Sequence, residues 1–202
     1  ITFGAQFSWT RAFVPGISNI GASGNGAITP ISNETLINTT NTPIDVVYIY
    51  TITTPDTCEN TESVTVVVNP APTILSSLTP PATCSGNIFN YPLTSSVTGT
   101  TYTWSRADII GISEPSSSGT TNISETLTNT TSATIAVTYI VTLTTGDGCV
   151  DTVNVIVDVE PVPAIATVIS GPTEVCAGST GNVYTVAAIT NATSYQWTLP
   201  DA

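Results

Sequence analysis

Hydrophobic and polar residues alternate along two stretches in the middle of the chain. Between residues 137 and 143 every second position is apolar, and threonine fills most of the positions between them. Between residues 153 and 159 valine occupies every second position. A period of two predicts β-strands with one buried face. The segment between the two stretches, TTGDGC, is rich in turn-forming residues, so we expect the two strands to form a hairpin.

The same pattern occurs earlier in the chain. Tyr48 precedes Tyr139 by 91 residues, and Cys58 precedes Cys149 by the same distance. The phrases FSWTR and TYTWSR also correspond, and a third copy begins near Pro163, where VCAGSTGNVY is similar to TCSGNIFNY. Self-similarity at a fixed period indicates a repeat protein. The expected parts are the last part of a first repeat, one complete repeat and the first part of a third, at residues 1–70, 71–161 and 162–202.

Each repeat has the make-up of an antiparallel β-sandwich. About seven short strands in about 90 residues, with one tryptophan on an early strand, fit an immunoglobulin-like fold. The joints NPAPTI and EPVPAI are short and rich in proline, so we expect them to be stiff. The sequence therefore predicts an all-β chain of tandem immunoglobulin-like β-sandwich repeats, stacked into a rod. Because it lacks an initiator methionine and ends within a repeat, we interpret it as an internal segment of a longer protein.

Composition narrows the range of functions. The 202 residues include 14 acids, two arginines, no lysine and no histidine, and the net charge is −12 at pH 7. Nucleic acids and anionic membrane surfaces attract cationic residues, so neither is an expected partner. No apolar run approaches the roughly 18 residues of a membrane span, so we expect no membrane insertion. Without histidine, lysine or a recognisable carboxylate pair, we expect no catalytic site, and no motif indicates a cofactor.

The two arginines each recur with one acid. Arg11 is followed by Glu34, and Arg106 by Glu125, about 20 residues later in each repeat. The planar guanidinium of arginine can bind a carboxylate at two points. With no other cation in the chain, the pattern predicts the structural ion pairs Arg11–Glu34 and Arg106–Glu125. An arginine that binds a ligand is the alternative.

Three tryptophans, Trp9, Trp104 and Trp197, recur at equivalent positions. A tryptophan on an early strand of this fold usually fills the space between the two sheets. We therefore expect all three in hydrophobic cores. A surface aromatic side chain that stacks on a sugar is the alternative.

The repeated phrases resemble a known group of repeats. CSG followed by YTW, then ETLTNTT, VTYIVTLTTGDGC and VNVIVDVEP, is similar to the PKD-like and immunoglobulin-like repeats of Bacteroidota cell-surface proteins. The segments GPTEVCAGSTGNVYTV and ATSYQWTLP resemble a neighbouring subtype. Such repeats occur in large SprB-like gliding-motility adhesins and in substrates of the type IX secretion system. The resemblance implies display on the cell surface and a role in adhesion or spacing, not catalysis.

For an extracellular protein, cysteines at matching positions suggest disulfides. Our first interpretation is a bridge between Cys84 and Cys149, which both belong to the complete repeat. Because Cys149 is expected near a hairpin tip and Cys84 in an early turn, the sandwich could place them at opposite ends. Bridges between neighbouring repeats, Cys58–Cys84 and Cys149–Cys176, are the alternative. Zinc is not expected, since there is no histidine and no close cysteine pair.

Two weaker signals concern calcium and glycosylation. Asp56 and Asp147 recur at hairpin tips, but too few further acids lie nearby to form a calcium site. Formal N-glycosylation sequons, such as NTT at Asn38 and Asn129, are common by chance in a threonine-rich chain. The phrase DTV resembles the O-glycosylation pattern of Bacteroidota, which implies Thr152 as the acceptor.

These observations predict a non-catalytic, extracellular repeat segment of a large bacterial surface adhesin or filament, attached to the outer membrane and acting as a stalk for adhesion or gliding. Its expected partners are the neighbouring repeats of the same chain, with surface polysaccharide or other surface proteins beyond them. The alternative function is a spacer or carbohydrate-binding module of a secreted polysaccharide-degrading enzyme. A third class is a self-assembling fibre with contacts between chains.

Overall fold

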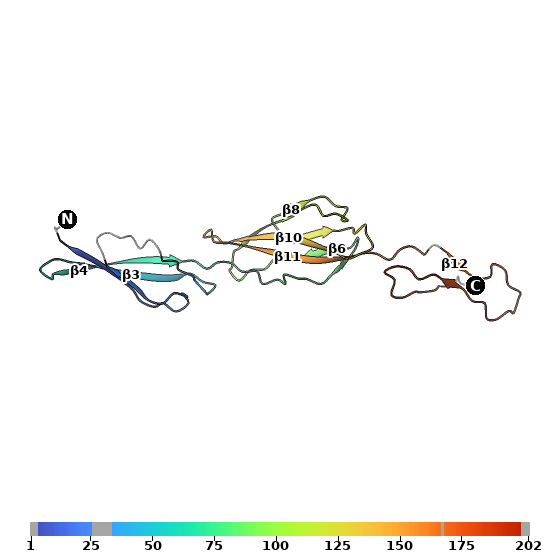
Figure 1. Ribbon diagram of the computed structural model, residues 1–202, viewed down its shortest axis with the longest axis horizontal. Helices are drawn as coiled ribbons and strands as arrows, with labels where there is room; N and C mark the ends of the chain where they lie inside the picture. The colour runs from blue at the N-terminus through green and yellow to red at the C-terminus, as the bar shows by residue number, and fades with distance from the viewer. Residues whose placement is uncertain (1–3, 26–33, 167, 199–202) are drawn as a thin grey trace. The chain divides into compact units, whose positions relative to one another are not determined.

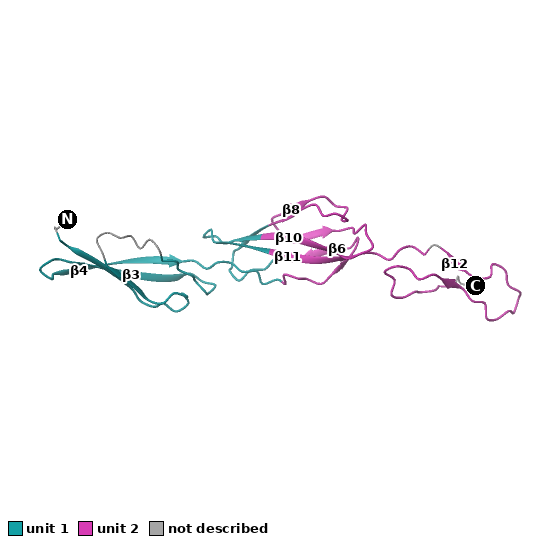
Figure 2. Ribbon diagram, viewed as in Figure 1, with its two compact units in different colours: residues 1–76, 93–103, 142–153 teal, residues 77–92, 104–141, 154–202 magenta. Residues whose placement is uncertain are grey.

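The computed structural model describes residues 4–25, 34–166 and 168–198, and every regular element in them is a β-strand (Figure 1). The fold is therefore all-β, as the period of two predicts. Among the described residues no helix is long and apolar enough to cross a membrane. These residues divide into two compact units (Figure 2), and the complete repeat contributes segments to both, so the strands are described in chain order. The repeat boundaries near residues 70 and 161 stay predictions.

The N-terminal part of the chain forms a four-stranded antiparallel sheet in the order β2-β1-β3-β4. Alternation along β3 turns Val46 and Tyr48 inward, where they form a buried cluster with Ile17. Trp9 of β1 packs against this cluster. The strands are β1 (Gln6–Arg11), β2 (Ala22–Asn25), β3 (Ile44–Thr53) and β4 (Glu59–Val68).

The complete repeat contains a five-stranded sheet in the order β5-β11-β10-β7-β8 and a two-stranded antiparallel sheet of β6 and β9. One pairing was not predicted: the short strand β5 runs parallel to the end of β11. The strands are β5 (Thr83–Cys84), β6 (Ile88–Tyr91), β7 (Thr101–Arg106), β8 (Ser117–Gly119), β9 (Ile123–Thr126), β10 (Ile135–Thr144) and β11 (Val150–Glu160).

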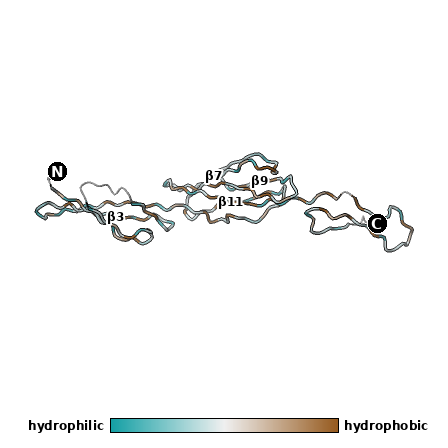
Figure 3. Tube along the Cα trace, in the orientation of Figure 1, coloured by the Kyte–Doolittle hydropathy of each residue, from teal (hydrophilic) through white to brown (hydrophobic). Residues whose placement is uncertain are grey.

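The core of the complete repeat follows from the alternating pattern. Hydrophobic and hydrophilic residues are interspersed along the strands (Figure 3), so each strand has an inner and an outer face. The ring of Phe89 on β6 stacks against that of Tyr139 on β10, with centroids 5.9 Å apart, which joins the two sheets into a sandwich. The inner side chains of β10 and β11 that are 0 % exposed are Val137, Tyr139, Val141, Leu143, Val155, Val157 and Val159.

The C-terminal part of the described chain has little regular structure. Its two strands, β12 (Ile169–Ser170) and β13 (Thr185–Val186), form a short antiparallel pair. Most side chains of this part are exposed, including those of Tyr184 and Trp197.

Candidate functional site

A charged cluster lies inside the complete repeat. Arg106 ends β7 and is only 2 % exposed, because it faces inward like Trp104 two residues before it. Its Nε donates to Oε2 of Glu125 on β9 at 3.0 Å, and its Nη2 donates to Oε1 at 3.4 Å. The hydroxyl of Tyr139 on β10 donates to the same Oε2 at 2.6 Å. Nη2 also donates to the carbonyl of Pro115 at 2.6 Å, so backbone oxygens complete the cage.

The first repeat contains the same cluster. Nε of Arg11 donates to Oε1 and Oε2 of Glu34 at 2.9 and 3.1 Å, and Nη2 also bonds to Oε1. The hydroxyl of Tyr48 donates to Oε2 of Glu34 at 2.6 Å, and Nη2 of Arg11 donates to the carbonyl of Ile20 at 2.5 Å. The structure thus brings together both arginine–glutamate pairs and adds a tyrosine to each.

Hydrogen bonds stabilise the ionised forms of the glutamates in these clusters. Burial alone would raise the pKa of Glu125, but hydrogen bonds from Arg106 and Tyr139 outweigh it, and the pKa lies below its usual value. For Glu34 the hydrogen bond from Arg11 has the largest effect and lowers the pKa. Burial, together with the hydrogen bond to Glu34, raises the pKa of Tyr48 to about 12. No buried side-chain nitrogen or oxygen in the described residues lacks a partner, so the clusters offer no open group to a ligand.

Trp104 fills the space beside the cluster. It is 8 % exposed, its ring meets that of Tyr139 edge-on at 5.7 Å, and its Nε1 donates to the carbonyl of Thr121 at 2.9 Å. The indole also covers Gly119, where an added Cβ would lie 2.7 Å from two indole carbons. Only a glycine fits under the ring at this position, so Trp104 is a core residue.

The other two tryptophans are less buried. Trp9 is half-buried, with its ring 5.8 Å from that of Tyr48. Trp197 is 53 % exposed, so the prediction that it lies in a core is wrong for the described structure. The physical reason is that Trp104 is covered by Tyr139 of β10, whereas the described residues include no counterpart of β10 for Trp197.

An asparagine fixes the end of each of the first two repeats, and it is half-buried in the first and buried in the second. Nδ2 of Asn129 donates to the carbonyls of Ala133 and Val159 at 2.7 and 2.8 Å, and Asn129 is 5 % exposed. Nδ2 of Asn38 makes the equivalent bonds, including one to the carbonyl of Val68 at 2.7 Å. Each amide therefore ties a loop to the last residues of a strand, and it is not free to accept a glycan. The recurrence of NTT was the available signal, but we interpreted it as a chance sequon.

Replacing Asn129 by alanine is expected to lower the free energy of unfolding of the complete repeat by about 1–3 kcal/mol, because the carbonyl of Val159 loses its donor in a buried site and that of Ala133 loses its donor in a half-buried one. Hydrogen exchange of amides in β10 would measure the change within this repeat. The matched control is Asn154→Ala on the exposed face of β11, where about 0.5 kcal/mol or less is expected. Equal effects of the two substitutions would contradict a stabilising role for the hydrogen bonds of Asn129.

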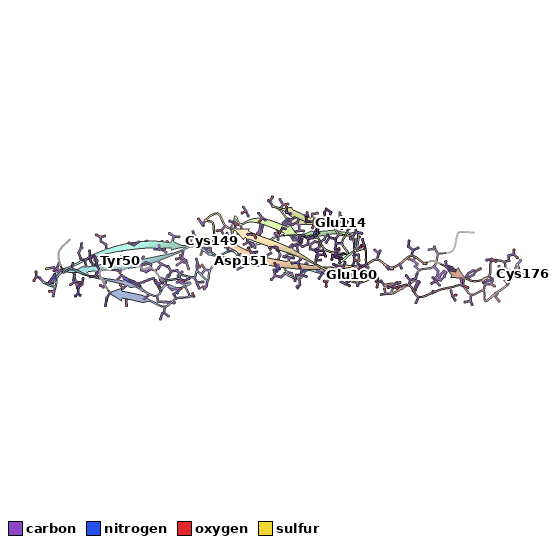
Figure 4. The ribbon with its side chains drawn as sticks, turned by 45° about the horizontal axis from the view of Figure 1, so that its top comes forward. Tyr50, Glu114, Cys149, Asp151, Glu160 and Cys176 are labelled. Atoms are coloured by element: carbon purple, nitrogen blue, oxygen red, sulfur yellow. The ribbon has the colours of Figure 1, made fainter. Side chains whose placement is uncertain are left out.

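Cys84 and Cys149 do not form the predicted bridge, and neither Cys58–Cys84 nor Cys149–Cys176 is formed, since all four thiols are unbonded. Cys84 is in register with Glu160, the last residue of β11, whereas Cys149 directly precedes the first (Figure 4). A strand of this length spans about 33 Å. A disulfide requires Cα atoms within about 7 Å of each other. The within-repeat bridge was therefore a wrong prediction, because the two thiols lie at opposite ends of one strand.

The remaining predictions concern modification of Thr152 and metal binding. Thr152 is exposed on β11, and its modification stays a prediction. Among the described residues, which include the hairpin tips with Asp56 and Asp147, no group of three or more potential metal ligands is present. Glu114, labelled in Figure 4, accepts a hydrogen bond from the backbone nitrogen of Thr128 at 2.7 Å and therefore braces a loop.

Comparison with known proteins identifies the type of repeat. Residues 81–163 match one family model described as a PKD-like domain, and residues 162–202 match a second model with the same description. A search of curated proteins finds no match. PKD-like domains are generally non-catalytic and typically extracellular, and their immunoglobulin-like β-sandwich is the fold of the complete repeat. From residue 81 onward, the chain is therefore similar to PKD-like domains.

Proposed function

We propose that the chain is a stalk segment of a large bacterial surface adhesin or filament, which holds a binding region away from the cell. The observation that carries the proposal is the parallel pairing of β5 with the end of β11. The backbone nitrogen of Ile156 donates to the carbonyl of Leu78 at 2.9 Å, and that of Ser85 donates to the carbonyl of Glu160 at 2.8 Å. The first and last segments of the repeat therefore run side by side in the same direction.

This pairing suits a repeat that carries tension. When the two ends of the repeat are pulled apart, parallel terminal segments slide along each other. All the hydrogen bonds between them are then loaded together, whereas bonds in a peeled hairpin break one after another. In the same repeat, hydrogen bonds among the side chains of Arg106, Glu125 and Tyr139 connect β7, β9 and β10. The repeat therefore has the construction expected of a load-bearing spacer.

The resemblance to repeats of SprB-like gliding adhesins supports a surface filament of Bacteroidota, exported by type IX secretion and attached to the outer membrane. Its partners would be the neighbouring repeats, then surface polysaccharide or other surface proteins. The carbohydrate-module alternative has less support, because Trp104 is buried and both arginines are fully paired.

Single-molecule stretching of the chain by its two ends tests the stalk. Ser85→Pro removes the N–H that bonds to Glu160 as well as the hydroxyl, whereas the matched control Ser85→Ala removes the hydroxyl alone. We expect the complete repeat of the proline variant to open at a clearly lower force than that of the alanine variant. Equal opening forces would remove the mechanical basis of the proposal.

A further inference from the structure

The cysteines occupy two kinds of position, and each kind occurs twice. Cys58 and Cys149 are hairpin-tip cysteines: their backbone nitrogens donate to Oγ1 of Thr54 and of Thr145 at 3.2 and 3.1 Å. Cys84 ends β5 and is the strand-end cysteine of the complete repeat; Cys176 is its counterpart in the third repeat, and the carbonyl of each accepts a backbone hydrogen bond from a following turn at 3.0 Å. None of the four is fully buried, so all can meet a partner thiol.

The strand-end cysteine lies where the chain leaves the complete repeat. Cys84 is in register with Glu160, which ends β11 and directly precedes Pro161. The loop held by Asn129 lies at the same end, because Nδ2 of Asn129 donates to the carbonyl of Val159 at 2.8 Å.

The hairpin-tip cysteine lies where the chain enters the repeat. Cys149 closes the turn after β10, and the carbonyl of Thr144 at the end of β10 accepts a hydrogen bond from Oγ1 of Thr101 at 3.1 Å. Thr101 begins β7, directly after the loop in which the nitrogen of Ser96 donates to the carbonyl of Thr73 at 2.9 Å. Thr73 is among the first residues of the repeat, so the entry point and the hairpin tip share one end.

Contacts at the joints connect the exit of one repeat to the entry of the next. Within the first compact unit, the loop of residues 38–41 lines the same hollow as Ala71, Thr73 and Ser96. Within the second compact unit, Nδ2 of Asn191 donates to the carbonyl of Ser132, in the equivalent loop, at 3.1 Å. Only a few residues of chain therefore join the exit end of one repeat, with its strand-end cysteine, to the entry end of the next, with its hairpin-tip cysteine. This short connection gives the two thiols a high effective concentration.

We propose that neighbouring repeats are cross-linked by a disulfide between the strand-end cysteine of one repeat and the hairpin-tip cysteine of the repeat that follows. The proposal takes its oxidising, extracellular setting from the proposed function. Two thiols lose two protons and two electrons to form the bond, and the oxidant is a protein or small-molecule disulfide that is reduced to two thiols by exchange. The bond would restrain each joint in addition to the proline-rich connection.

This pairing differs from both predicted from the sequence. Cys84 would form its disulfide with the hairpin-tip cysteine of the third repeat, and Cys149 would form its disulfide with the strand-end cysteine of the first repeat. At a spacing of 91 residues, both partner positions fall outside residues 1–202.

The order of repeats provides the test. Residues 71–161 are duplicated in tandem within the full chain, with Cys58→Ser and Cys176→Ser. In the forward variant the first copy carries Cys149→Ser and the second Cys84→Ser, so that only Cys84 of the first copy and Cys149 of the second remain. The reverse variant exchanges the two substitutions and has the same composition.

After equilibration in a glutathione redox buffer and alkylation, we expect the forward variant to take up no alkyl groups and the reverse variant to take up two, by intact mass. Circular dichroism verifies that both variants are folded. Free thiols in the forward variant, a bond in the reverse variant, or equal bonding in both would overturn the proposal. The stretching experiment does not depend on these thiols, so failure of the cross-link is distinguishable from failure of the stalk.

Discussion

Replacing Arg106 by alanine is expected to destabilise the complete repeat by about 3–5 kcal/mol, because the substitution leaves the carboxylate of Glu125 in a largely buried site without its cation. The hydroxyl of Tyr139 would then be the main remaining donor to that carboxylate. Chemical denaturation, with hydrogen exchange of amides in β10 to assign the transition to this repeat, would measure the loss.

A double-mutant cycle separates the ion pair from other effects of the substitution. Glu125→Gln keeps the shape of the side chain and removes its charge, so the combination with Arg106→Ala should cost less than the sum of the two single substitutions. Strictly additive costs would show that the two side chains do not interact directly. Arg11→Ala with Glu34→Gln repeats the cycle in the first repeat, where the same hydrogen bonds are present.

The cycle also has a defined dependence on pH. The folded protein lowers the pKa of Glu125. The ion pair with Arg106 therefore stabilises the fold fully at pH values above the pKa of the unfolded state, near 4.5. This contribution is lost as the pH falls through the lower, folded-state pKa. The coupling energy is therefore measured at neutral pH, and it should shrink in acid.

The sequence predicted the strands because alternation has a direct physical cause: a β-strand turns successive side chains to opposite faces. It paired each arginine with one acid because the chain has only two cations and both recur with the same neighbour. The hydroxyls of Tyr48 and Tyr139 were missed, since a tyrosine in an alternating strand cannot be distinguished from a plain apolar residue until the third dimension is known. Asn129 was missed for a similar reason, because its carbonyl partners lie on separate segments.

The cysteines show a different limit. Spacing along the chain showed that each kind recurs, but it could not show which end of the sandwich each occupies. That depended on the parallel pairing of β5 with β11, which involves two residues and leaves no periodic trace in the sequence. The prediction of tryptophan burial had the same limit, because the burial of each ring depends on which strands lie opposite it.

Replacing Trp104 by alanine is expected to destabilise the complete repeat by about 3–5 kcal/mol, since the deletion leaves a cavity between the sheets. Three contacts would be lost together: the edge-on packing against Tyr139, the hydrogen bond to the carbonyl of Thr121 and the cover over Gly119. The matched control is Trp197→Ala. Trp197 is 53 % exposed, whereas Trp104 is 8 % exposed, so the control should cost far less. Both are measured by hydrogen exchange, of amides in β10 for Trp104 and of residues 184–196 for Trp197. Equal losses at the two positions would contradict the assignment of Trp104, and not Trp197, to a packed core.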